Sequence, residues 1–318
     1  MPETIDVRVA HRYRVAEDII CLELTPLSSP ALPAFQPGAH IDIHLASGAI
    51  RPYSLCGDPK STDRYRLAIL LDAAGRGGSR EVHESLLEGS TLKIGMPRNA
   101  FPLVEGAAHS VLIAGGIGVT PLLAMAMSLR DSGLSFEFHY VTRSKSRAAF
   151  VNELIDCCGL PRFRLYSRDA QGGIGFSASS VIPPPEDGTH LYVCGPQRLI
   201  ASVVATAKEK GWNDAHIHLE VFAPSTPRTG AAFRVVANRS NKSIDIGPEQ
   251  TIADALLDAG IDVPLSCEAG ICGTCITSVL EGIPEHRDSF LTDEEREQNQ
   301  KMAVCCSRSR SSTLVLDI

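Results

Sequence analysis

The sequence lacks several features that would indicate particular classes of protein. An excess of positive charge is missing, because 30 Lys and Arg stand against 37 Asp and Glu, and the net charge of −7 argues against a nucleic-acid partner. Segment 1–20 contains scattered charges and no apolar run, so no signal peptide is predicted. Six of the ten cysteines show no pairing pattern, which fits reduced thiols in a cytoplasm better than a secreted disulfide framework; they are Cys21, Cys56, Cys157, Cys158, Cys194 and Cys306.

A convincing membrane span is also missing, although one segment has the right length. Residues 111–129 form a run of nineteen residues without a charged side chain. Glycines and a central Thr120-Pro121 pair interrupt this run. It therefore predicts a strand, a glycine turn and a buried helix, and no association with a membrane.

Cysteines near the end of the chain have the spacing of iron–sulfur ligands. Cys267, Cys272 and Cys275 follow the pattern C-x4-C-x2-C, and Cys305 and Cys306 lie further on. Glycines within the first loop suit it, because glycine lets the backbone approach a cluster and adopt positive φ. A disulfide set and a zinc site are the alternatives, but zinc knuckles usually carry paired CxxC units and only one such unit is present here.

This stretch resembles the plant-type ferredoxins, which bind a [2Fe–2S] cluster. In that family the distance from the third to the fourth ligand matches Cys305 rather than Cys306. The resemblance implies that Cys267, Cys272, Cys275 and Cys305 hold the cluster, and that residues 231–318 form an α+β (β-grasp) domain. Such a cluster accepts one electron at a time, so another part of the chain has to supply single electrons.

Residues 1–101 contain alternating runs of strand length separated by turn residues, which predicts a small antiparallel β-barrel. Arg51, Tyr53 and Ser54 lie on or just after one of these strands. An arginine can pair with a phosphate, a tyrosine can lie along an aromatic ring, and a serine can hydrogen-bond a redox nitrogen.

A glycine-rich turn precedes a helical stretch in the same region. Its backbone N–H groups and the start of the helix could receive an oxyanion, although a plain flexible turn is the commoner meaning of such a sequence. The candidate phosphate-binding residues are Gly75, Gly77, Gly78 and Ser79.

Together these two motifs resemble the flavin barrel of the ferredoxin–NADP reductase superfamily. The resemblance implies that Arg51 contacts the flavin phosphate, Tyr53 the isoalloxazine face and Ser54 the surroundings of N5. The alternative is an ordinary barrel strand with a satisfied arginine.

Residues 102–223 have the pattern of a doubly wound α/β domain. A strand at 109–114 leads into a glycine turn, where Gly116 and Gly118 leave room for a pyrophosphate at a helix start. Thr120 is the expected N-cap and Pro121 the expected first helical residue. The turn is weak evidence alone, but it resembles the GGxGxTP variant of the same superfamily.

The next strand, 135–142, leads into a basic run that begins at Arg143. A doubly wound fold places the adenosine ribose here, so basic residues could accept a 2′-phosphate. The Thr-Arg-Ser sequence nevertheless resembles that of relatives that use NADH, and NADH is the expected nucleotide. A solvated basic loop is the alternative.

A later strand ends at Cys194, and Gly195 and Pro196 follow it at the expected start of a helix. In the superfamily this cysteine lies beside the nicotinamide, whereas a small buried hydrophobe is the bland alternative. By the same resemblance, Phe222 would shield the flavin where nicotinamide binds. His216 and His218 are expected on a strand face rather than at a metal.

The order of these parts resembles the phthalate dioxygenase reductase family, which includes vanillate demethylase reductases. It predicts a flavin barrel at 1–101, a nicotinamide domain at 102–223, a linker at 224–230 and a ferredoxin domain at 231–318. The resemblance implies FMN, NADH and a separate Rieske oxygenase that acts on an aromatic acid. The sequence contains no C-x-H…C-x-x-H pattern of its own. Pro52 replaces the commoner threonine before Tyr53.

These parts form one expected mechanism. NADH gives two electrons as a hydride and the cluster accepts one, so a flavin has to connect them. Ser54 would stabilise the reduced flavin and Cys194 would position the nicotinamide. Two alternatives remain: a stand-alone NADH:quinone (haloquinone) reductase, and a non-enzymatic iron–sulfur carrier.

Overall fold

The computed structural model describes residues 3–73, 77–169, 175–222, 229–265, 268, 270, 273–288 and 290–318. The chain divides into two compact units, Met1–Pro196 with Ala205–Glu220 and Val221–Ile318 with Gln197–Val204. A helix long and apolar enough to cross a membrane does not occur in these ranges.

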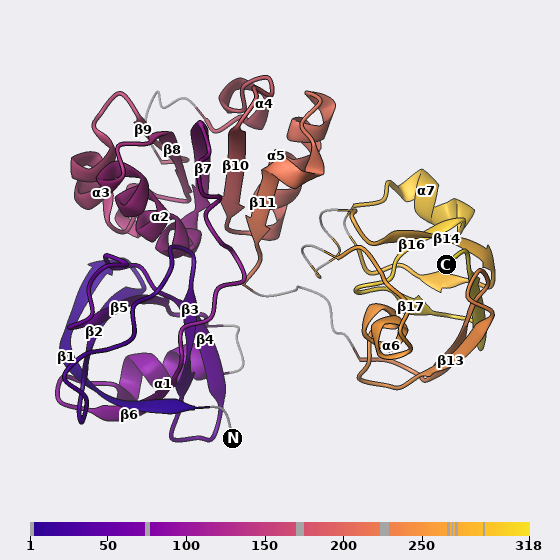
Figure 1. Cartoon of the computed structure of the whole chain (residues 1–318), viewed down its shortest axis with the longest axis horizontal. Helices are drawn as coiled ribbons and strands as arrows, with labels where there is room; N and C mark the ends of the chain where they lie inside the picture. The colour runs from indigo at the N-terminus through magenta and orange to yellow at the C-terminus, as the bar shows by residue number, and fades with distance from the viewer. Residues whose placement is uncertain are drawn as a thin grey trace. The chain divides into compact units, whose positions relative to one another are not determined.

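The first sheet of the N-terminal unit is the predicted antiparallel barrel (Figure 1). Its strands run in the order β4-β3-β6-β1-β2-β5, and a bridge between Leu55 and Leu67 brings the end of β4 beside β5. Inward side chains of alternating positions fill one apolar core. The elements are β1 (Thr4–Ala16), β2 (Ile19–Pro26), β3 (His40–His44), β4 (Ile50–Ser54), β5 (Tyr65–Leu70), α1 (Gly78–Ser85) and β6 (Thr91–Gly95).

The second sheet of this unit is parallel and doubly wound, as predicted. Its order is β11-β10-β7-β8-β9, so the chain order reverses between β7 and β10. Ligands of such folds bind beyond the carboxyl ends of the strands at this switch point. The elements are β7 (His109–Gly115), η1 (Gly116–Gly118), α2 (Val119–Asp131), β8 (Ser135–Thr142), η2 (Lys145–Arg147), α3 (Val151–Cys158), β9 (Phe163–Ser167), α4 (Ala178–Val181), β10 (Thr189–Cys194), α5 (Gln197–Glu209), η3 (Asp214–His216) and β11 (Ile217–Glu220).

The C-terminal unit is α+β. A five-stranded sheet in the order β13-β12-β18-β14-β16 is accompanied by the β15-β17 pair. Capping boxes begin both helices, at Thr251 with Asp254 and at Thr292 with Glu295. The elements are β12 (Phe233–Ala237), β13 (Lys242–Ile246), α6 (Ile252–Asp258), β14 (Ile276–Glu281), β15 (Pro284–Glu285), α7 (Asp293–Gln298), β16 (Lys301–Ala303), β17 (Arg308–Ser309) and β18 (Thr313–Leu316).

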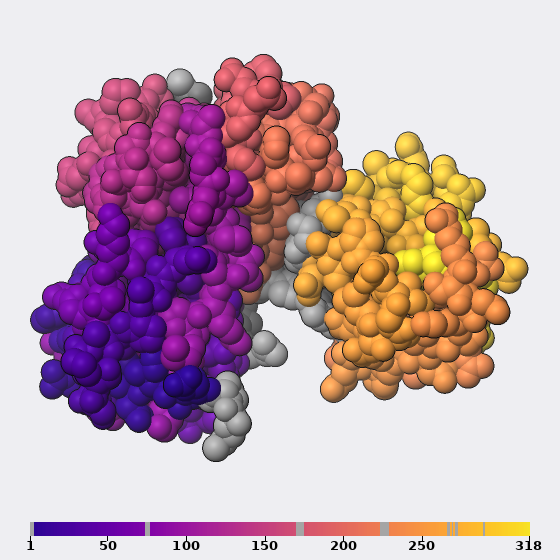
Figure 2. Space-filling view, viewed as in Figure 1, coloured from indigo at the N-terminus to yellow at the C-terminus, as the bar shows by residue number. Residues whose placement is uncertain are grey.

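The barrel packs directly against the parallel sheet within the N-terminal unit. Barrel residues Cys56, Ala68 and Phe101 belong to the same buried cluster as the apolar face of α2. The space-filling view shows the indigo and magenta surfaces in continuous contact (Figure 2). Arg66 in β5 also forms a two-pronged ion pair with Glu153 in α3, with a shortest contact of 2.6 Å.

Two details of helix starts differ from the sequence-based expectation. Thr120 is not an N-cap: α2 begins at Val119 after Gly118, and the Thr120 hydroxyl donates to the Ile117 carbonyl. The reason is that the 3-10 turn η1 already winds the chain from Gly116, so Pro121 occupies the third helical position. Similarly, Pro196 is the N-cap of α5 rather than its first residue.

Candidate functional site

The predicted phosphate-binding groups of the barrel lie together. Arg51 is on β4, and Gly78 is the first residue of α1. A Cβ atom on Gly78 would lie 2.5 Å from Arg51 Nε, so the guanidinium lies directly against the helix start. Gly77, at φ 84°, is the N-cap and needs the left-handed conformation. An arginine beside the first N–H groups of a helix fits a phosphate.

The other members of this motif flank that cradle. Tyr53 and Ser54 end β4, opposite Ile41 and His40 of β3. Ser54 is buried, and burial raises the pKa of Tyr53 to about 12. The Ser79 hydroxyl accepts a hydrogen bond from the Asp72 N–H at 3.0 Å. Gly75 lies outside the described residues.

The two glycine motifs of the parallel sheet meet at the switch point. A Cβ atom on Gly118 would lie 2.2 Å from the Cys194 carbonyl oxygen and 2.8 Å from Gly195 N. A Cβ atom on Gly195 would lie 2.7 Å from Gly115 Cα. The loops that follow β7 and β10 therefore touch backbone to backbone, as a dinucleotide site at this position requires. Gly116, at φ 54°, faces open space.

Barrel strand β5 connects the flavin motif to this switch point. It contacts β4, which carries Arg51, Tyr53 and Ser54, and it also contacts the glycine turn η1. Cys56, two residues after Ser54, shares a buried cluster with Cys194. The residues predicted to bind a flavin and a nicotinamide therefore lie along the boundary between the barrel and the parallel sheet of the N-terminal unit. We call this boundary the seam.

Glu220 is a residue of this seam that the sequence did not indicate. It pairs with Cys194 in the register of β10 and β11, and the thiol donates to Glu220 Oε2 at 3.8 Å. Burial raises the pKa of Glu220 to about 7. Burial and the nearby carboxylate together raise the pKa of Cys194 well above its ordinary value. The seam therefore contains a neutral thiol beside a carboxyl that exchanges its proton near neutrality.

The basic loop after β8 is partly neutralised. Arg147 pairs with Glu17 at 2.9 Å and also with Asp18, both on the barrel. The N–H of Lys145 donates to the carboxylate of Asp169, which follows β9, at 3.1 Å. Arg143 is exposed. An acidic group thus approaches the loop where a doubly wound fold receives the adenosine ribose.

Two of the four predicted cluster ligands lie in described parts of the C-terminal unit. Cys275 and Cys305 are buried, and their thiols hydrogen-bond each other. That bond lowers the pKa of Cys305, but Cys306 and burial raise it to about 12 overall. Cys267 and Cys272 lie outside the described residues.

The neighbouring thiol, Cys306, has a different environment. A Cβ atom on Gly270 would lie 2.6 Å from Cys306 Sγ and 2.8 Å from Asp288 Cα. Gly270 and Gly273 both have positive φ, at 71° and 77°. A Cβ atom on Gly273 would lie 2.3 Å from the Phe290 ring. Glycine is therefore required at both positions, as a loop closely wrapped around a cluster demands.

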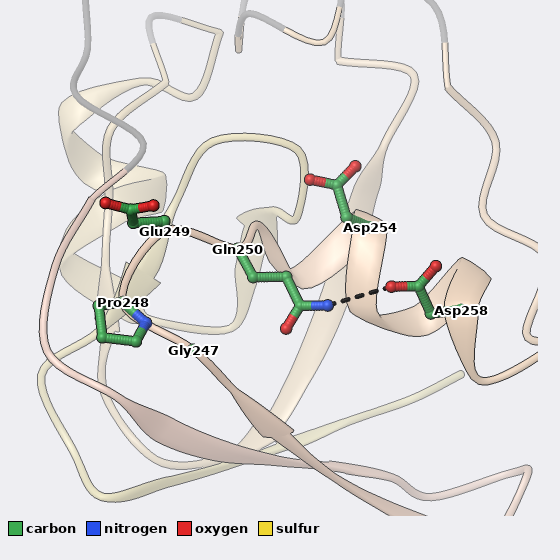
Figure 3. A pocket seen from close by; sticks show the side chains of 6 residues that line it. All are labelled: Gly247, Pro248, Glu249, Gln250, Asp254 and Asp258. Atoms are coloured by element: carbon green, nitrogen blue, oxygen red, sulfur yellow. Dashed lines mark hydrogen bonds between the residues drawn. The ribbon is translucent and has the colours of Figure 1, made fainter. Parts of the chain in front are cut away.

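Three further predicted or exposed features are found among the described residues. Phe222 follows β11 and is 44% exposed. His218 stacks on Tyr192 and forms a hydrogen bond with His190 at 3.0 Å, so it lies on a strand face as expected. His216 was also expected on a strand face, but it ends the 3-10 turn η3 before β11 begins. A surface hollow on the C-terminal unit contains three carboxylates (Figure 3). It is lined by Gly247, Pro248, Glu249, Gln250, Asp254 and Asp258.

Comparisons with known proteins agree with this arrangement. Residues 235–310 match the model of the 2Fe-2S iron-sulfur cluster binding domain, and residues 95–217 match that of the dimethylamine monooxygenase subunit DmmA-like N-terminal domain. Vanillate O-demethylase oxidoreductase from Pseudomonas sp. strain HR199 is 44% identical over 99% of this chain and 100% of its own length. Tetrachlorobenzoquinone reductase from Sphingobium chlorophenolicum is 40% identical over 99% and 98%.

A solved structure extends the match to the whole fold. The structure of phthalate dioxygenase reductase, described as modular for electron transfer from pyridine nucleotides to [2Fe-2S], is 36% identical and has a TM-score of 0.67. It covers 99% of this chain and 98% of its own. The predictions of the three-part fold, a [2Fe–2S] cluster, a flavin, a nicotinamide nucleotide and an electron-transfer reductase are thereby confirmed. The chain belongs to the family of vanillate O-demethylase oxidoreductases and phthalate dioxygenase reductase.

Proposed function

We propose that this chain is the NADH-dependent reductase of an aromatic oxygenase or demethylase system, and that it passes electrons through FMN and a [2Fe–2S] cluster to a separate Rieske-type terminal oxygenase. The observation that carries the proposal is the contact between the Gly118 turn and Cys194-Gly195 beside the flavin strand. The bound flavin accepts a hydride and releases its electrons one at a time. The domain limits of 1–101, 102–223 and 231–318 and a cytoplasmic location belong to the same proposal.

Arg51 and the N-terminus of α1 would hold the flavin phosphate. Gly77, Gly78 and Ser79 bring backbone N–H groups beside the guanidinium, and Gly75, which lies outside the described residues, belongs to the same proposed site. The resemblance to the phthalate dioxygenase reductase family favours FMN as the flavin held here. Tyr53 would contact the ring system, and the Ser54 hydroxyl would donate a hydrogen bond to it.

The switch point would hold NADH. Gly116, Gly118 and Gly195 clear side chains from the path of the pyrophosphate, and Thr120 ties the turn by its bond to Ile117. Cys194 would position the nicotinamide and exclude water, while its thiol donates a hydrogen bond to Glu220 Oε2. Phe222 would cover the place where nicotinamide enters.

The loop after β8, where the adenosine ribose would bind, favours NADH over NADPH. Arg147 is already paired with Glu17 and Asp18, so it is not free for a 2′-phosphate. Asp169 presents a carboxylate at the same loop and would repel one. Arg143 remains exposed and would contact the adenosine half of the nucleotide.

The C-terminal unit would hold the cluster with Cys267, Cys272, Cys275 and Cys305. The support for Cys305 is its hydrogen bond with Cys275, whereas the Cys306 thiol donates to the Ala303 carbonyl at 3.9 Å. Thiolates are the expected ligands for this cluster. With four cysteine ligands, the two iron atoms of the cluster would have no open position for a small substrate, which fits a role in electron transfer.

A stand-alone quinone reductase is the second candidate, because the chain is 40% identical to a tetrachlorobenzoquinone reductase. One set of assays separates the two functions. The purified, reconstituted protein is supplied with NADH and with either a Rieske-type aromatic O-demethylase component or a chlorinated benzoquinone. Rapid demethylation at a rate set by the reductase supports the proposal. Efficient quinone reduction without any turnover by the oxygenase contradicts it. Chromatography of the extracted flavin should give FMN, and FAD would contradict that assignment.

A further inference from the structure

Two arginines grip the segment by which the chain enters the ferredoxin domain. Arg308 is only 2% exposed, and its guanidinium donates to the carbonyls of Ala231 at 2.9 Å, Gly247 at 2.9 Å and Gln250 at 2.8 Å. It also lies over the Phe233 ring, 5.2 Å from the ring centre. The turn 247–250 that supplies two of these carbonyls is drawn in Figure 3.

The second arginine holds the residue two positions earlier. Arg287 Nη1 donates to the Thr229 carbonyl at 2.9 Å, and its guanidinium pairs with Glu285 at 2.8 Å. Between the two contacts, Gly230 N donates to the Pro248 carbonyl at 2.9 Å. Residues 229–231 are therefore bound at three successive positions.

Gly230 has no space for a side chain between these arginines. A Cβ atom there would lie 2.6 Å from Arg308 Nε and 3.1 Å from Arg287 Nη2. Arg308 cannot move aside cheaply, because three carbonyls and an aromatic ring fix its guanidinium. A glycine is required here by close approach and not by backbone conformation.

The same arginines belong to the segments that surround the proposed cluster site. Arg308 comes three residues after Cys305, and the Arg287 N–H donates to the hydroxyl of Ser307 at 3.1 Å. The two arginines therefore connect residues 229–231, by which the chain enters the ferredoxin domain, to the segment that would supply the fourth cluster ligand. A cation in this position could equally serve the cluster itself, and the test has to separate the two roles.

We propose that Arg287 and Arg308 form a clamp that fixes where the connecting segment leaves the ferredoxin domain, and thereby sets the rate at which electrons pass from the flavin to the cluster. This inference rests on the proposed cluster site. With the clamp closed, the seven steps from Phe222 to Thr229 span at most about 25 Å. With it open, the eleven steps from Phe222 to Phe233 span at most about 40 Å.

The longer tether lowers the effective concentration of one domain near the other. This concentration falls roughly as the −3/2 power of tether length, which gives a decrease of about twofold for the change from seven to eleven residues. The connecting segment would also lose its fixed direction where it leaves the ferredoxin domain, which lowers this effective concentration further. Arg287 and Arg308 are positioning residues, since they act through the tether and not on a reacting atom.

Two variants open the clamp in different ways. The double variant Arg287→Lys/Arg308→Lys keeps both charges but cannot donate to the carbonyls of Thr229, Ala231, Gly247 and Gln250 in the same fork geometry. Gly230→Ala keeps both arginines and forces the chain out of the space between them. Arg310→Lys is the matched control, because Arg310 is exposed and lies two residues away.

Hydrogen exchange and rapid kinetics of the reconstituted full chain test the proposal. In both variants, and not in the control, we expect faster exchange of the Gly230 amide and flavin-to-cluster electron transfer slowed about twofold or more. Hydride transfer from NADH, iron content, the cluster midpoint potential and its electron paramagnetic resonance spectrum should stay unchanged.

Three results would overturn the proposal. The first is unchanged exchange at Gly230 in both variants, which would mean that the arginines do not hold the segment. The second is faster exchange with unchanged electron transfer. The third is a changed cluster spectrum, potential or iron content, which would assign the arginines to the cluster. Absence of any cluster in the wild-type protein would instead contradict the proposed function.

Discussion

Replacement of Gly118 by alanine should disrupt the nicotinamide site without preventing folding. Gly118 has φ −61°, which alanine adopts easily, so the effect comes from contact alone. The new Cβ atom would lie 2.2 Å from the Cys194 carbonyl oxygen, where a comfortable separation is about 3.3 Å. The loops after β7 and β10 therefore have to separate by about 1 Å.

A displacement of about 1 Å between reacting groups can slow a reaction about 100-fold. We expect the rate of flavin reduction by NADH to fall by about that factor in stopped-flow absorbance measurements, while flavin content is retained. Overpacking should also lower the free energy of unfolding by about 1–3 kcal/mol. Gly175→Ala is the matched control, because a Cβ atom there has no described neighbour within 4 Å. A wild-type rate in Gly118→Ala would refute the assignment of these loops to the nicotinamide.

Three further predictions concern single side chains. Cys305→Ser should abolish the visible iron–sulfur absorbance, whereas Cys306→Ser should retain it; the reverse result would exchange the two assignments. Because burial raises the pKa of Glu220 from 4.5 to about 7, the free energy of unfolding should decline as the pH rises from 4.5 to about 7 and level off above that, and Glu220→Gln should remove this decline in urea titrations. Burial and neighbouring histidines lower the pKa of His218 from 6.5 to about 4, so the free energy of unfolding should fall as the pH drops from 6.5 toward 4. His218→Phe should flatten this part of the pH profile, and an unchanged slope would contradict the lowered pKa.

Most of the fold could be predicted from the sequence because the turn residues that separate its strands and helices are recognisable locally. Glycine turns at 115–118 and after Cys194 interrupt apolar runs, and the structure places them at the strand ends where they were expected. The N-cap role of Thr120 was wrong because a 3-10 turn began the helix earlier, which residue preferences alone do not reveal.

The missed residues depend on partners that are distant in sequence. Glu220 faces Cys194 only through the parallel register of β10 and β11. Arg147 belonged to an apparently free basic run, but carboxylates 129 and 130 positions earlier neutralise it. Arg308 was not singled out by any sequence motif, and it is buried against backbone carbonyls. No local pattern signals such pairings, since each depends on how separate elements pack.

The central claim is that electrons from NADH reach the cluster only by way of the flavin. Its most direct test mixes the reconstituted protein with NADH without oxygen and follows flavin absorbance and the cluster's electron paramagnetic resonance signal in the same time course. The account predicts that flavin bleaching precedes the cluster signal, and that protein stripped of flavin gives no cluster signal at all. Reduction of the cluster by NADH in flavin-free protein would contradict it.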